Sequence, residues 1–306
     1  MIKYNVLVLF AVFFLSSCKN DTNEKAAQEH DFSNYDVEVQ GHRGDRGNFP
    51  ENSIPAFISA TKKGVDVLEL DVVISGDKEV VVSHEPYMHA LYMSSPTGDS
   101  IVSEKDHEFN LYQMNYDSIK AFDGGSRGNK NFPQQAKLKT YKPLLSEVID
   151  TVSKYIAANN LNKIKFNIEL KSSELDYGKF QPDPAEFIEL VMKVIMDKGI
   201  EDQTYIQSFD ANLLNVLRRN YPEANIAYLV SDKGINRNLK KLEFIPMIYS
   251  PNVKLVQNKA FVDSIKNLGM RLIPWTVNDE KDIDRMIELK VDGIISDYPE
   301  RVLNKK

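Results

Sequence analysis

Three things are scarce in this chain of 306 residues: cysteine, long apolar runs and an excess of positive charge. Cys18 is the only cysteine, so the chain cannot form an internal disulfide. The formal net charge is −6 at pH 7, which argues against a nucleic-acid-binding protein, because such proteins usually carry a basic stripe. A mildly acidic protein can still bind a phosphate group locally, through a metal ion and one or two cations.

The apolar run near the N-terminus, residues 6–15, spans about 10 residues and is too short to cross a bilayer as a helix. Lys3 precedes the run and two serines follow it, which is the pattern of a secretory signal. The order Leu15-Ser16-Ser17-Cys18 resembles a bacterial lipobox, in which the cysteine becomes the lipidated N-terminus. A plain signal peptide with an incidental cysteine is the alternative.

We therefore expect a lipoprotein signal peptide over residues 1–18 and a flexible polar tether over residues 19–34. Lipidation of Cys18 would place the protein in the bacterial cell envelope, at the outer membrane, facing the periplasm or the surface. The protein would then associate with the membrane through this anchor.

From Val37 onward, short apolar runs alternate with amphipathic segments, which is typical of repeated βα units. The length suits one closed barrel of about 250 residues. We therefore predict an α/β fold, a TIM (β/α)8 barrel, as a single domain over residues 35–306. The eight expected barrel strands cover residues 37–41, 67–73, 165–170, 205–208, 226–230, 247–250, 272–276 and 293–296.

A further apolar run, Val80-Val81-Val82, follows the second barrel strand after a turn that contains Gly and Asp, which indicates a β-hairpin. A turn centred between Asp77 and Lys78 would set His84 opposite Asp71. A hairpin cannot supply the crossover that parallel strands need, so we expect an excursion above the barrel. Residues from about 86 to 142 show little periodicity and are predicted to be a long insertion, a loop region or small cap over the site.

Catalytic residues of such barrels lie at the carboxyl ends of the strands. His42, the pair Glu69 and Asp71, and the pair Glu169 and Lys171 all fall at expected strand ends. Residues i and i+2 of a strand share a face, so Glu69 and Asp71 can both point into the barrel mouth. With Glu169 they form a cage of oxygen ligands suited to Mg²⁺ or Ca²⁺. The alternative is solvated strand-end acids, but the apolar residues around the first pair favour a site.

His42 and His84 are the candidate acid and base, because imidazole can do both near neutral pH. A lone histidine at a strand end is often structural, whereas two beside a carboxylate cage favour catalysis. Arg43 offers a planar fork for phosphate oxygens, and Lys171 offers a point charge. Trp275 either lines the pocket at its strand end or belongs to the core. These residue types suit metal-assisted chemistry on a phosphate.

The motifs in combination resemble those of the glycerophosphodiester phosphodiesterase family, over about residues 37–303. The family has a barrel fold related to bacterial phosphatidylinositol-specific phospholipase C. The motifs that carry the resemblance are Gly41-His42-Arg43-Gly44, Pro50-Glu51-Asn52-Ser53, Leu68-Glu69-Leu70-Asp71-Val72, Val82-Ser83-His84, Ile168-Glu169-Leu170-Lys171, Gln207-Ser208-Phe209, Trp275-Thr276-Val277-Asn278 and Gly293-Ile294-Ile295-Ser296-Asp297.

The resemblance implies roles for individual residues. The divalent metal would be bound by Glu69, Asp71 and Glu169. His42 and His84 would act as acid and base. Arg43 and Lys171 would contact the phosphate. The sequence departs from the family at Glu85-Pro86, where an aspartate is usual, and in the length of the segment up to Lys142. Both departures bear on substrate specificity more than on chemistry.

The implied function is metal-dependent hydrolysis of a small glycerophosphodiester to sn-glycerol 3-phosphate and an alcohol. The attacking group would be water or the 2-hydroxyl of the glycerol, which would give a cyclic phosphate. One alternative is phospholipase D-like or polymer-directed cleavage. Another is a non-catalytic lipoprotein that binds glycerophosphodiesters for a transporter. This last alternative is disfavoured because every expected acid, base and metal position is occupied.

Overall fold

The computed structural model describes Met1 and residues 36–306. The expected signal peptide, the tether and Cys18 lie outside the described residues. Among the residues that are described, no helix has both the length and the apolar character to cross a membrane.

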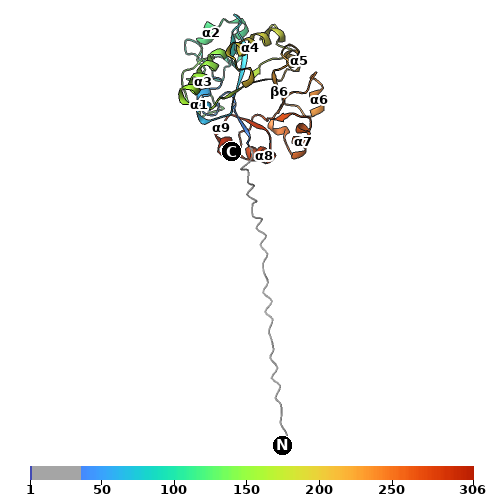
Figure 1. The fold of residues 1–306 in the computed structure, drawn as a ribbon. Helices are drawn as coiled ribbons and strands as arrows, with labels where there is room; N and C mark the ends of the chain where they lie inside the picture. The colour runs from blue at the N-terminus through green and yellow to red at the C-terminus, as the bar shows by residue number, and fades with distance from the viewer. Residues whose placement is uncertain (2–35) are drawn as a thin grey trace. The chain divides into compact units, whose positions relative to one another are not determined.

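The core of the domain is a parallel barrel, as the sequence predicted (Figure 1). The strands hydrogen-bond in the order β8-β7-β6-β5-β4-β2-β1-β9, and β3 pairs antiparallel with β2 alone. Residues Val67–Val72 pair with Lys165–Leu170 over six positions, the longest register in the sheet. The strands are β1 (Glu38–Gly41), β2 (Val67–Ile74), β3 (Val80–Val82), β4 (Lys165–Leu170), β5 (Thr204–Ser208), β6 (Asn225–Val230), β7 (Ile248–Pro251), β8 (Arg271–Leu272) and β9 (Gly293–Ser296).

The barrel is nearly closed between β8 and β9. The strand expected over residues 272–276 is shorter in the structure, because Pro274 has no N–H to continue a ladder. Three backbone hydrogen bonds still cross the seam, from Ile295 N to Pro274 O at 3.1 Å, from Asp292 N to Leu272 O at 2.9 Å and from Val277 N to Ile295 O at 2.9 Å. The eighth strand therefore completes the barrel with few regular pairs.

Helices surround the strands and bury their apolar faces against them (Figure 1). α1 (Ile54–Lys63) begins at the N-cap Ser53 with a proline in its first turn and ends at Gly64, where φ is 87°. These are the start and stop signals that local sequence predicts. Phe57 of this helix is fully buried in the main core, and replacing such a side chain by alanine typically costs about 3–5 kcal/mol. The other helical elements are α2 (Tyr116–Lys120), α3 (Leu145–Asn159), α4 (Pro184–Lys198), α5 (Ala211–Asn220), α6 (Ile235–Leu239), α7 (Lys259–Lys266), α8 (Glu280–Glu288), α9 (Pro299–Leu303), η1 (Ser103–Glu108), η2 (Leu111–Gln113), η3 (Glu201–Gln203) and η4 (Val253–Leu255).

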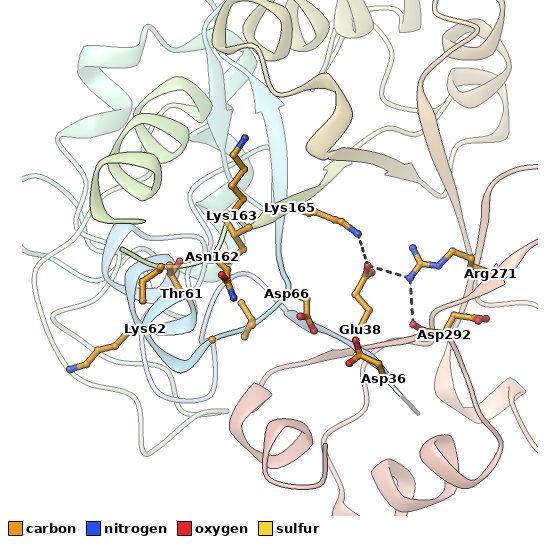
Figure 2. A pocket seen from close by; sticks show the side chains of 14 residues that line it. Asp36, Glu38, Thr61, Lys62, Asp66, Asn162, Lys163, Lys165, Arg271 and Asp292 are labelled. Atoms are coloured by element: carbon orange, nitrogen blue, oxygen red, sulfur yellow. Dashed lines mark hydrogen bonds and ion pairs between the residues drawn. The ribbon is translucent and has the colours of Figure 1, made fainter. Parts of the chain in front are cut away.

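A charged network occupies the amino end of the barrel strands. Glu38, Lys165 and Arg271 begin β1, β4 and β8, and the Glu38 carboxylate lies 3.2 Å from both cations (Figure 2). They line a cavity of about 460 Å³, together with Asp66 and Asp292. Every ion pair here joins residues of different strands or loops, so we assign this end a structural role. The chemistry of such barrels belongs to the opposite, carboxyl end.

The segment after β3 is an insertion with its own small core. It contains η1, η2 and α2, and its buried apolar side chains pack against the two strands of the hairpin. The segment returns beside β3, where Val82 N donates to Pro143 O at 2.8 Å and Val81 forms a bridge with Leu144. The members of this core are Val73, Val81, Met88, Tyr92, Met93, Ile101, Leu111, Ile119 and Phe122.

The register of the hairpin differs from the one expected by one residue. Ile74 pairs with Val80, and Ser75 N donates to Glu79 O at 3.0 Å, so the loop has three residues instead of two. Lys78 takes the left-handed conformation, with φ of 66°, which three-residue hairpin loops require at that position. Consequently Asp71 lies opposite Ser83, and the prediction that it lies opposite His84 was wrong.

Candidate active site

His42 follows the last residue of β1, and an aspartate from the far end of the chain fixes its ring. Its Nδ1 lies 2.6 Å from Oδ1 of Asp297, which follows β9. The amide of Asn278 donates to the other oxygen of Asp297 at 2.6 Å. The Nε2 atom of His42 lies 4.0 Å from Glu69. Burial lowers the pKa of His42 below its usual value, although Asp297 acts to raise it.

The turn after His42 requires unusual backbone angles. Arg43 has φ of 52° and Gly44 has φ of 84°, both in the left-handed region. A side chain on Gly44 would also bring its Cβ to 2.7 Å from the carbonyl carbon of Ala56 in α1. This tight turn directs the Arg43 N–H to Glu69 Oε2 at 2.8 Å. The glycine therefore lets the turn pack on the helix that follows it.

The three predicted carboxylates meet at the carboxyl side of β2 and β4. Glu69 and Asp71 lie on β2, and Glu169 on β4 is the direct cross-strand partner of Asp71. One oxygen from each lies within 4.8 Å of the others, and all three side chains are buried. The Oδ1 atom of Asp71 is buried and, within residues 36–306, accepts no hydrogen bond. Oxygen atoms gathered in this way can hold a divalent cation.

The electrostatics of the cluster also favour a cation. Burial, together with the charges of Asp71 and Glu169, raises the pKa of Glu69 well above its usual value. Burial likewise raises the pKa of Glu169. Burial acts in the same direction on Asp71, but the charges of Arg43, His84 and Lys171 hold its pKa well below the usual range. Three buried carboxylates repel one another, and a bound metal ion would offset that repulsion.

The two predicted cations lie against these carboxylates. Arg43 is buried, with Nη1 at 2.6 Å from Glu51 and Nε at 3.2 Å from Asp71. Lys171 Nζ lies 2.6 Å from Glu169 and 3.6 Å from Asp71. Both cations therefore stand beside the cluster, where a phosphate would meet them. Their contacts with substrate stay predictions.

His84 lies just beyond the end of β3, in the loop that opens the insertion. Its Nδ1 lies 2.7 Å from Oε1 of Glu85, and its side chain is 31% exposed. Burial is the largest influence on the pKa values of Asp71 and Glu169, and a positive charge on His84 acts to lower both. The structure therefore brings His84 to the same site as His42, although not through the register expected.

Trp275 is half-buried at the rim beyond β8. Its Nε1 donates to Ser250 O at 2.9 Å, and its ring meets Phe209 edge-on with centroids 5.3 Å apart. Phe209 is 40% exposed. The indole also packs against the apolar side chains inside the barrel, so Trp275 lies between this core and the mouth of the barrel.

The sequence reasoning quoted four polar residues as parts of motifs but gave them no role in holding the carboxylates and His42. Gln207 donates to Glu69 at 2.8 Å, and Asn52 donates to Asp71 at 2.8 Å. The other two are Asn278 and Asp297 beside His42. Gln207 and Asp297 both sit at carboxyl ends of barrel strands, and that position was a signal that could have found them.

The chain forms a nearly closed parallel barrel with a histidine–aspartate pair at the carboxyl ends of its strands, which is the arrangement of a barrel enzyme. Its buried carboxylate cluster could hold a metal ion. Residues 42–301 match the model of the glycerophosphoryl diester phosphodiesterase family, and the chain belongs to this family. It is therefore a phosphoric diester hydrolase, a glycerophosphodiester phosphodiesterase.

Relatives and solved structures agree with this assignment. A glycerophosphodiester phosphodiesterase of Bacillus altitudinis is 30% identical over 269 residues, which cover 87% of this chain and 97% of that protein. A Silicibacter pomeroyi structure assigned to the glycerophosphoryl diester phosphodiesterases has a TM-score of 0.79 and 28% identity, covering 89% of this chain and 93% of that one. An Oleispira antarctica phosphodiesterase, solved with the product sn-glycerol-3-phosphate, has a TM-score of 0.68 and 24% identity, covering 89% of this chain and 97% of that one.

Proposed function

We propose that this enzyme hydrolyses small glycerophosphodiesters to sn-glycerol 3-phosphate and an alcohol. The observation that carries the proposal is the buried carboxylate cluster with His42 beside Glu69 and two cations against it. A site of this composition suits one phosphate group. The product bound to the Oleispira antarctica enzyme supports the choice of product.

The residues present fit a divalent metal. Glu69, Asp71 and Glu169 would hold it, because their oxygens are buried together and one of them lacks a hydrogen-bond partner in the described part of the chain. Oxygen ligands of this kind favour Ca²⁺ or Mg²⁺. When bound, the ion would polarise the phosphate oxygens and neutralise developing charge.

His42 acts as the general base in this proposal. Because burial lowers its pKa, the ring is neutral at neutral pH, and its Nδ1–H donates a hydrogen bond to Asp297, so Nε2 is free to accept a proton. Nε2 faces the carboxylate cluster. It removes the proton of the attacking hydroxyl, whether that belongs to water or to the glycerol moiety.

His84 acts as the general acid. A bond forms between the attacking oxygen and phosphorus, the bond between phosphorus and the alcohol oxygen breaks, and His84 delivers a proton to that oxygen. Arg43 and Lys171 stabilise the charge on the phosphate. Neither cation changes its protonation state, because neighbouring carboxylates raise the pKa of both despite burial.

A substrate panel tests the proposal. The purified enzyme is incubated with glycerophosphocholine, lysophosphatidylcholine or a glycerol-phosphate polymer, and ³¹P NMR follows the products. We expect glycerol 3-phosphate from glycerophosphocholine at the highest rate, and a cyclic phosphate signal only if the 2-hydroxyl attacks. Preferred release from lysophosphatidylcholine or polymer would favour the phospholipase D-like or polymer-directed alternative. Binding of glycerophosphocholine without turnover would contradict the enzymatic role.

We also propose that Cys18 anchors the protein to the outer membrane of the bacterial envelope through a lipid. Support comes from the lipobox-like sequence before this cysteine. A Cys18→Ser variant, expressed from the full chain in a bacterial host, should leave the membrane fraction and lose incorporation of labelled fatty acid. Retention of both label and membrane association would contradict the anchor.

A further inference from the structure

The carboxylate of Glu85 connects His84 to the inserted segment. Its Oε1 lies 2.7 Å from Nδ1 of His84, and its Oε2 accepts a hydrogen bond from the hydroxyl of Tyr92, also at 2.7 Å. The Glu85 side chain is 16% exposed, and Tyr92 is buried. Both carboxylate oxygens are thus used, one toward the predicted general acid and one toward the insertion.

The ring of Tyr92 is buried in the core of the insertion. It is a member of the apolar cluster that packs on β2 and β3, so the position of its hydroxyl depends on the folding of the whole segment. A neutral hydroxyl donating to a carboxylate is a charge-assisted hydrogen bond, which is short and strong when shielded from water. Burial, and then the negative charge of Glu85, raises the pKa of Tyr92 well above its usual value. The hydroxyl therefore stays protonated and can donate.

The far end of the insertion reaches the same place. Lys142 is buried, and its Nζ donates to Ser83 Oγ at 2.7 Å. The hydroxyl of Ser83 donates in turn to the carbonyl of Glu85 at 2.5 Å. The Lys142 ammonium also lies 5.8 Å from the ring centroid of Tyr92. The beginning and the end of the insertion therefore meet at Glu85.

The charges around Glu85 keep it ionised. Burial acts to raise its pKa, but the hydrogen bond and charge of His84, and then the charges of Lys142 and Arg43, hold the pKa well below its usual range. Burying a charged lysine without an acid nearby costs free energy. Burial lowers the pKa of Lys142, and the charge of Glu85 is the largest influence that acts to raise it. The two groups support each other's charged state.

We propose that Glu85 is a positioning residue for His84. The inserted segment fixes Glu85 through Tyr92 and, by way of Ser83, through Lys142. Glu85 accepts a hydrogen bond from Nδ1–H of His84, so the proton that His84 gives to the leaving oxygen comes from Nε2, and the neutral ring left behind is the Nδ1–H tautomer. The insertion thus helps to orient His84, the proposed general acid. This inference rests on the proposed role of His84 as general acid.

Steady-state kinetics on glycerophosphocholine give the first test. We expect Glu85→Ala to lower kcat by about 10- to 100-fold, as loss of an orienting partner of a histidine typically does, with little change in KM. Glu85→Gln, which keeps an oxygen acceptor, should lose less. The matched control is Glu79→Gln on the exposed turn of the same hairpin, which should behave as wild type. A wild-type kcat for Glu85→Ala would overturn the proposal.

A double-mutant cycle separates positioning from general damage. Tyr92→Phe and Lys142→Met should each lower kcat in the wild-type background by less than Glu85→Ala does. Tyr92→Phe should not lower it further in the Glu85→Ala background, because Tyr92 acts through the Glu85 carboxylate. Full additivity of the Tyr92→Phe and Glu85→Ala effects would contradict the proposed connection.

The tautomer of His84 can be measured without turnover. In ¹⁵N-histidine-labelled protein, with His84 assigned by its absence in His84→Gln, the neutral ring should show a protonated Nδ1. In Glu85→Ala the Nε2–H form should gain population, and an unchanged tautomer would refute positioning. If His84→Ala is fully active while the tautomer shifts as expected, the proposed acid fails and the positioning stands.

Discussion

Replacing His42 by alanine should lower kcat by roughly 10²- to 10⁴-fold, the usual contribution of a general base. The variant should fold, because the ring is held mainly by one hydrogen bond to Asp297 and lies at the rim beyond β1. Binding of substrate should change little, since the carboxylate cluster and the two cations stay in place. Turnover of glycerophosphocholine measures the loss. The exposed His107, in the insertion, supplies a matched control as His107→Ala.

The Asp297→Asn variant tests the same base by its pH profile. Asp297 raises the pKa of His42 against the larger, lowering effect of burial, so removing its charge lowers that pKa further. Protonation of His42 causes the acid limb of kcat/KM, and this limb should therefore move to lower pH in the variant. The plateau should also fall, because asparagine orients the ring less strongly. A limb that stays in place or moves to higher pH would exclude His42 as the base.

Loss of a carboxylate from the cluster should abolish metal-dependent activity. We expect Glu69→Gln to lower activity by at least about 100-fold, since even outer partners of metal ligands cost 10- to 100-fold. The amide keeps the size of the side chain, and its single oxygen can still accept a hydrogen bond from Arg43 N–H or from Gln207. Activity is measured after chelation and after titration with Ca²⁺ or Mg²⁺. Full activity after chelation would contradict a metal mechanism.

The Glu69→Gln variant should lose activity but not thermal stability. Burial and the charges of Asp71 and Glu169 penalise ionised Glu69, so a neutral side chain should leave the metal-free protein as stable as wild type or more stable at pH 7. A ligand that binds only the folded state stabilises it, by about 2.7 kcal/mol at 100 times the dissociation constant. Added metal should therefore raise the Tm of wild type and of the exposed control Glu79→Gln, but not that of Glu69→Gln.

Much of the barrel was readable because its signals are local. The start of α1 at Ser53 and its end at Gly64 follow from capping and from left-handed geometry, which depend on a few neighbouring residues. Glu69 and Asp71 could be placed on one face because the side-chain period of a strand is two. The position of Glu169 at the end of the next expected barrel strand joined it to this pair, and the structure puts the three side chains together.

The hairpin shows where local reasoning ended. Whether two or three residues form the loop depends on the conformation of Lys78, a residue with no strong preference for positive φ. One residue of difference changes every cross-strand partner, and Ser83 replaces His84 opposite Asp71.

The sequence by itself determined the alternation of strands and helices, the acids on β2 and the position of His42 at the end of β1, because spacing and residue type decide these features. Only the tertiary structure decided which side chains support them. Asp297 lies 255 positions from His42, and Tyr92 reaches Glu85 only because the insertion folds its own core. Partners of this kind depend on barrel closure and on packing between distant segments, and no local pattern records either.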